Sequence, residues 1–165
     1  TILHEIPDSV GDDLGSDGHI RYPKAFDGRP GDLAALRWMK SDAGYILEIQ
    51  MQGPLSTVWN PAHGLDHLNL QIQMDGITRL EYRLDGWNAS GSTVWEWFTD
   101  APGGKVYALF PQPGFVPPHR IQVRTWDSDG SGQPRLLSNQ PGAYEFQGNP
   151  LAEKWMDEAV LKTIP

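Results

Sequence analysis

The stretch GDDLGSDGHIRYP (11–23) concentrates carboxylates in a glycine-rich turn. Asp12, Asp13 and Asp17 lie within six residues, and no lysine or arginine precedes Arg21. Aspartates this close repel one another in a folded turn unless a cation compensates their charge. Calcium takes roughly six to eight oxygen ligands, from carboxylates and from backbone carbonyls that glycine-containing loops present well. The candidate calcium ligands are Asp8, Asp12, Asp13 and Asp32. A solvated turn built on Asp-Gly chemistry is the alternative.

The tryptophans are a second group with possible chemistry. Seven occur in 165 residues, more than one core of this size requires. In STVWEWFTD, Trp95 and Trp97 share one face of a strand, and Val94 and Phe98 point the other way. A tryptophan plane suits a sugar because the axial C–H groups of a pyranose stack on the ring while nearby amides and carboxylates bind its hydroxyls. The candidate sugar platforms are Trp95, Trp97, Trp59, Trp87 and Trp126. Burial in the core is the alternative for each, and it is the expectation for Trp38.

Three segments alternate apolar and polar residues with a period of two, which predicts half-buried strands. They are YILEIQMQG (45–53), LNLQIQMD (68–75) and RIQVRTWD (120–127). Their polar sides supply further candidate sugar ligands, which are Glu48, Gln50, Gln71 and Gln73. If these strands are neighbours, the polar sides form one broad hydrogen-bonding field. An ordinary solvated sheet exterior is the alternative.

The remaining pattern predicts an all-β fold. Eighteen glycines and fourteen prolines interrupt the chain too often for a long helix before residue 150. Further strands are expected at 32–39, 78–84, 93–99 and 104–110, with loops at 53–64, 85–92 and 111–118. Half-buried strands separated by turns predict an antiparallel two-sheet β-sandwich. We expect a single domain over 1–165, with 150–165 as either a C-terminal strap or a short helix.

The composition limits the classes of partner that the chain is expected to bind. A net charge of −8 argues against nucleic acid and anionic membranes, which are bound mainly through lysine and arginine, and leaves neutral ligands and cations. The absence of cysteine excludes disulfides and thiolate chemistry. No apolar run approaches the roughly 20 residues of a membrane-spanning helix. The chain begins at Thr1, so we expect either that a leader has been removed or that this is a piece of a larger exported protein.

Three stretches carry a resemblance to a known family. The segment from IPDSVGDDLG to YILEIQM (6–51) resembles the opening of the glucodextranase-type C-terminal domains. WNPAHGLDHLNLQIQMD (59–75) is similar to the Asn-Pro loop of that family and the strand that follows it. The segment from VRTWDSDG to YEFQGN (123–149) is similar to its late hairpin.

The resemblance implies an immunoglobulin-like or jelly-roll-like β-sandwich, related to family 9 carbohydrate-binding modules and to the DOMON group. Such domains are appended to secreted or surface-attached polysaccharide-degrading enzymes, and their acidic opening typically holds calcium. The chain departs from the family at PGDL (30–33), where Phe-Asp-Leu is usual and Phe26 instead lies upstream. Asp27 therefore becomes a further candidate calcium ligand, which can replace Asp32 or compete with it.

No catalytic motif stands out. The chain has neither a Gly-x-Ser-x-Gly nucleophile turn nor a phosphate-binding glycine loop before a helix. We therefore predict a non-catalytic, calcium-stabilised module that binds a neutral glycan and contacts other domains of its parent protein. The expected location is extracellular, at a bacterial or archaeal cell surface, or periplasmic.

Two alternatives remain open. One is a surface-anchoring or protein-interaction module that binds no sugar. The other is a haem-binding DOMON-type domain with a methionine and a histidine as axial ligands. Its candidate methionines are Met39, Met51, Met74 and Met156, of which Met51 and Met74 are expected in the core.

Overall fold

A computed structural model describes residues 1–8, 32–53, 67–83, 86–89, 96–100, 102–128 and 155–163. For residues 67–68, 82–83, 86–89 and 127–128 it describes the backbone alone. Within these segments no helix is long and apolar enough to cross a membrane.

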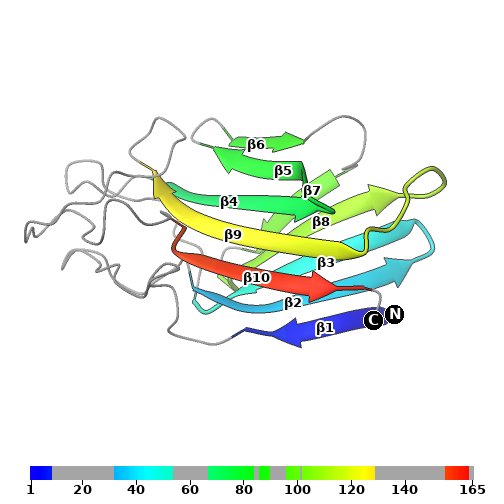
Figure 1. The fold of residues 1–165 in the computed structure, drawn as a ribbon, viewed down its shortest axis with the longest axis horizontal. Coiled ribbons are helices and arrows are strands. Elements are labelled where there is room, and N and C mark those ends of the chain that lie inside the picture. Colours follow the sequence, from blue (N-terminus) through cyan, green and yellow to red (C-terminus); the bar gives the residue numbers. More distant parts are fainter. Residues whose placement is uncertain are drawn as a thin grey trace, which may run out of the picture.

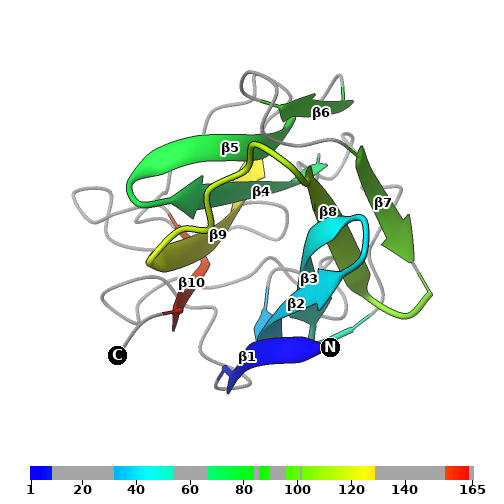
Figure 2. The same ribbon diagram turned by 90° about the vertical axis from the view of Figure 1, so that its right-hand side faces the viewer.

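In the part of the chain that the structure describes, ten strands form two five-stranded antiparallel sheets (Figure 1). The first sheet has the order β1 (Ile2–Pro7), β2 (Leu33–Ser41), β3 (Gly44–Met51), β8 (Lys105–Pro111), β7 (Glu96–Asp100). The second sheet has the order β10 (Asp157–Lys162), β9 (Arg120–Ser128), β4 (His67–Met74), β5 (Ile77–Arg83), β6 (Gly86–Ala89). Seen from the side, the two sheets lie face to face as two layers (Figure 2). The prediction of an antiparallel β-sandwich is therefore confirmed.

The core lies between the sheets and is built from alternate residues of each strand. On β3 and β4 alternate apolar residues point inward, and among them Leu47, Ile49 and Ile72 are fully buried. Trp38 is 1% exposed, as expected, and stacks on Tyr45 with ring centroids 5.2 Å apart. Met51 and Met74 are core residues too, as expected.

The strand boundaries agree with the predicted segments in most places and depart from them in three. The segment 85–92, expected as a loop, contains β6. β1, which the sequence did not predict, pairs along β2 at the end of the first sheet. The C-terminal segment forms β10, which pairs with β9 from Asp157 to Lys162, so the helical alternative is wrong there.

Asp157 links the two sheets through its buried carboxylate. The side chain belongs to β10 of the second sheet, and its Oδ2 accepts the backbone N–H of Leu33, the first residue of β2 in the first sheet, at 2.6 Å. Its Oδ1 accepts the N–H of Glu158 at 2.8 Å. The carboxylate thus satisfies a backbone donor at the start of β2 that is buried at this end of the sandwich.

The β7–β8 turn is fastened to the end of β3. The carbonyl of Gly104 accepts the N–H of Met51 at 2.7 Å, and Gly104 has φ of +67°, in the region that favours glycine. A Cβ at this position would overlap the carbonyl oxygen of Gly53. Gly76, in the β4–β5 turn, has a similar φ of +81°, but nothing lies within 4 Å of the position its Cβ would take.

Substituting these two glycines distinguishes the cost of backbone strain, which both positions share, from the cost of steric overlap, which arises only at Gly104. Gly76→Ala should lower the free energy of unfolding by about 1–2 kcal/mol, the cost of left-handed backbone for an L residue. Gly104→Ala should cost clearly more, because the added methyl also pushes the turn away from β3. Urea denaturation of both variants and the wild type measures the difference. Equal losses would contradict the close approach at Gly104.

Candidate functional site

Strand register places five side chains in one line across the outer face of the first sheet. Paired positions on consecutive strands run from Glu5 on β1 to Arg37 on β2, Glu48 on β3, Tyr107 on β8 and Phe98 on β7. We call this line the outer row. The inward neighbours of these residues on β2, β3 and β8 belong to the core, so the outer row faces away from the second sheet.

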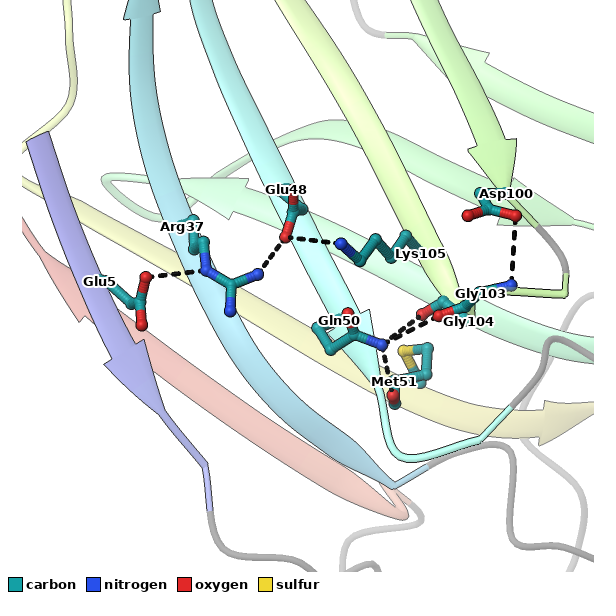
Figure 3. Close-up of polar contacts among 9 residues, drawn as sticks. All are labelled: Glu5, Arg37, Glu48, Gln50, Met51, Asp100, Gly103, Gly104 and Lys105. Atoms are coloured by element: carbon teal, nitrogen blue, oxygen red, sulfur yellow. Dashed lines mark hydrogen bonds and ion pairs between the residues drawn. The ribbon is translucent and has the colours of Figure 1, made fainter. Parts of the chain in front are cut away.

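One half of the outer row is an ionic network (Figure 3). Arg37 donates from Nε to Glu5 Oε2 at 2.7 Å and from Nη1 to Glu48 Oε1. Lys105 Nζ lies 3.7 Å from the same Glu48 oxygen. The two carboxylates raise the pKa of Arg37, chiefly through the hydrogen bond to Glu5 and then through the one to Glu48. Glu48 is only 7% exposed, and its burial is tolerated because two cations face it.

The other half of the outer row is aromatic. Tyr107 and Phe98 stack across β8 and β7 with ring centroids 4.6 Å apart and planes 19° from parallel. Burial raises the pKa of Tyr107, and the negative charge of Glu48 raises it further, while Lys105 acts in the opposite direction. Tyr107 therefore stays neutral at physiological pH and can hydrogen-bond to Glu48. Phe98, at the end of the row, is 48% exposed.

Gln50 lies beside the outer row and holds the β7–β8 turn. Its Nε2 donates to the carbonyls of Met51 at 2.9 Å and Gly103 at 3.0 Å (Figure 3). In the same turn, Asp100 Oδ1 accepts the N–H of Gly103 at 3.1 Å. The side-chain amide of Gln50 is thus occupied by backbone carbonyls, and Glu48 is largely covered. Their use as sugar ligands stays a prediction.

The predicted polar field is divided between opposite faces of the sandwich. Glu48 and Gln50 lie on the first sheet, whereas Gln71 and Gln73 lie on β4 of the second. Only the second group has the expected neighbours on β9: Gln71 pairs with Arg124 and Gln73 with Gln122. The condition for a single field is therefore not met, because β3 and β4 belong to different sheets.

The structure describes the side chains of two of the predicted tryptophan platforms, the partly buried Trp97 and the fully buried Trp126. Trp97 packs against the core, so on β7 it is Phe98, not the tryptophan, that faces outward. Trp126 is 1% exposed and meets the edge of Trp155 with ring centroids 4.7 Å apart. A ring covered in this way has no free face for a sugar. Arg124 adds to this cluster, with its guanidinium carbon 4.8 Å from the Trp155 ring centroid.

The other predicted sugar platforms remain predictions. Trp59 and Trp95 lie outside the described residues, and of Trp87 only the backbone is described, as part of β6.

Two of the five predicted calcium ligands, Asp8 and Asp32, have their backbone near the start of β2. The N–H of Asp8, just after β1, donates to the carbonyl of Ala34 near the start of β2 at 2.8 Å. Asp32, just before β2, is 1% exposed, and its carbonyl accepts the N–H of Gln52. Within the described segments no three acidic, histidine or cysteine side chains converge in a way that could hold a metal. The other predicted ligands, Asp12, Asp13 and Asp27, lie outside those segments.

Sequence reasoning missed most of the outer row. Glu5, Arg37 and Tyr107 of the row, and Lys105 beside it, were not singled out, because no motif marks them and their strands had no known order. Alternation does place Phe98 opposite Trp97, but it does not say which of the two faces the core. The signal that was available is the pair of carboxylates, Glu96 and Asp100, that share the face of Phe98.

Comparison with protein-family models matches residues 3–103 to the C-terminal binding module, SLH-like, of glucodextranase. The chain belongs to this family. The match covers more than half of the chain and includes β1 through β7, and with them Glu5, Arg37, Glu48 and Phe98 of the outer row. A search of curated proteins finds no match. The resemblance read from the sequence is thus confirmed for its first two stretches, whereas the third (123–149) lies outside the matched residues, and the family is one of binding modules.

The ionic half of the outer row yields a stability prediction. Arg37→Met should lower the free energy of unfolding by about 1–3 kcal/mol, because it leaves the buried Glu48 without its closest cation. Adding Glu48→Met should recover most of that loss, since replacing both partners removes the uncompensated charge. Urea denaturation of the single and double variants measures this. Purely additive losses would contradict the pairing.

Proposed function

We propose that this protein is a non-catalytic accessory module that binds a neutral glycan for a secreted or cell-surface carbohydrate-active protein, and that calcium stabilises it. The family match is the observation that carries the proposal, because the matched description is that of a binding module of glucodextranase. The same match supports an extracellular or cell-surface location, and we propose that this is a bacterial or archaeal cell surface or the periplasm.

The chemistry of the surface agrees with a neutral sugar. An exposed aromatic ring, Phe98, lies on the same sheet face as fixed carboxylates and amides, the combination that pyranose recognition requires. The net charge of −8 disfavours polyanionic glycans. Affinity per site should be weak, because each sugar hydroxyl exchanges good hydrogen bonds with water for equally good ones with protein.

The calcium proposal is supported by the carboxylates at the Asp8 and Asp32 end of the first sheet. Asp157 of β10 is buried at the same end, where it accepts the N–H of Leu33 next to Asp32. Aspartates crowded in the sequence between Asp8 and Asp32 repel one another, and a divalent cation offsets that repulsion. Asp8 and Asp32 would hold the ion, together with the predicted ligands Asp12, Asp13 and Asp27 and with backbone oxygens.

A second candidate function is docking to a protein partner without sugar binding. The outer face of the first sheet also carries a line of apolar residues beside the outer row. Ile2, Met39, Ile46 and Leu109 are paired positions on β1, β2, β3 and β8, and Ile2 is 55% exposed. An apolar strip on an outer sheet face is typical of surfaces that pack against another domain.

Affinity electrophoresis separates the two functions. We expect the protein to be retarded in native gels that contain at least one of dextran, soluble starch, barley β-glucan, laminarin or xylan, relative to a gel without polysaccharide. Alginate, a polyanion, should cause no retardation. Unchanged mobility in every gel would contradict sugar binding and favour docking to a protein.

Thermal melts test the ion. Calcium that binds only the folded state raises the melting temperature by mass action, by an amount equivalent to about 2.7 kcal/mol at a hundredfold excess over Kd. We expect this increment in the wild type and in Asp42→Asn, a change in the exposed β2–β3 turn, and its loss in Asp32→Asn. If excess EDTA and excess calcium give the same wild-type melting curve, the ion has no structural role.

A further inference from the structure

Phe98 is unusual among the described side chains. Among the described residues, the exposed large apolar side chains are those of Ile2, Leu3, Ile77, Phe98 and Val116. Of these five, only Phe98 is aromatic. It lies on β7, the last strand of the first sheet, whose neighbour in the ladder is β8. One face of its ring meets Tyr107 at a centroid distance of 4.6 Å. The opposite face is turned away from β8, toward the side where β7 has no neighbour in the sheet, and the residue is 48% exposed.

Hydrogen-bonding groups flank this ring. Glu96 and Asp100 are two residues before and after Phe98, so the period of the strand puts all three on one face, and both carboxylates are exposed. Asp100 is held in place by the N–H of Gly103, which donates to its Oδ1 at 3.1 Å, and leaves Oδ2 for another donor. Carboxylate oxygens accept hydrogen bonds from sugar hydroxyls without competing with the ring for space.

The ring is also held in position before any ligand arrives. Phe98 stacks on Tyr107, Tyr107 lies next to Glu48, and Glu48 is fixed by Arg37 and Lys105. This chain of contacts spans four strands, from β7 at the edge of the sheet to β2. A ring that is ordered in the free protein loses little conformational entropy on binding.

We infer that Phe98, together with Glu96 and Asp100, forms a sugar subsite on the outer edge of β7 that stacks one pyranose ring of a neutral glycan. The inference rests on the proposed function, and it specifies which surface of the module binds the glycan. The aromatic plane supplies the stacking surface, and the two carboxylates accept hydroxyl hydrogen bonds on either side. The same carboxylates repel uronic acids, which selects neutral polymers.

Isothermal titration with gluco-oligosaccharides tests this subsite in four proteins: the wild type, Phe98→Ala, Phe98→Trp and Ile77→Ala. The probes are α-1,6-, α-1,4-, β-1,4- and β-1,3-linked oligosaccharides of glucose. Ile77 is the matched control, because it is 54% exposed and lies on β5 of the other sheet. We expect Phe98→Ala to weaken binding at least tenfold, Phe98→Trp to retain it, and Ile77→Ala to leave it unchanged.

Both positions are about half exposed, so all four proteins should fold, and thermal melts verify this. If Phe98→Ala binds as tightly as the wild type, the subsite is overturned while the module function stands. If the wild type binds none of the oligosaccharides and no polysaccharide retards it, the subsite and the proposed function both fall.

Discussion

The packing of two apolar sheet faces against each other is the constraint on which the rest of the structure depends. Each five-stranded sheet has one side that must leave water, and the sandwich buries both in one core that includes Leu47, Ile49 and Ile72. Once those side chains point inward, the period of the strand sends their neighbours outward. The outer row is therefore a consequence of the core: Arg37, Glu48 and Tyr107 are the residues left on the solvent side of β2, β3 and β8.

The outer row shows how a sheet exterior can be more than a solvated surface. Glu48 is nearly buried there, yet its charge is compensated by Arg37 on one side and Lys105 on the other. The network stiffens the face through side-chain contacts that the backbone ladder alone does not provide. Toward β7 the contacts change from ionic to aromatic, and the row ends there in an exposed aromatic ring, that of Phe98. Rigidity inside the row and exposure at its end are what a stacking site needs.

The first and last strands are joined to the sandwich at one end of the first sheet. At one end of the first sheet, Asp8 and Asp32 bracket the start of β2, and Asp157 joins the second sheet to Leu33. The C-terminal strand β10 is thereby hydrogen-bonded to the first residue of β2, which lies more than a hundred residues earlier in the sequence. A cation at this end would strengthen a junction that buried carboxylates already form. The aromatic end of the outer row lies on β7, on the far side of the same sheet.

The sequence by itself determined the fold class, the family and the two faces of each well-patterned strand, because alternation with a period of two and the acidic opening motif are local properties. It predicted Trp38, Met51 and Met74 in the core for the same reason. Only the tertiary structure decided which stripes share a surface, since strand order depends on long-range pairing: Glu48 and Gln71 ended on opposite sheets. The tertiary structure also decided that Trp97 points inward and Phe98 outward. Alternation places two neighbouring aromatic residues on opposite faces, but only the packing of the sheets decides which face is buried.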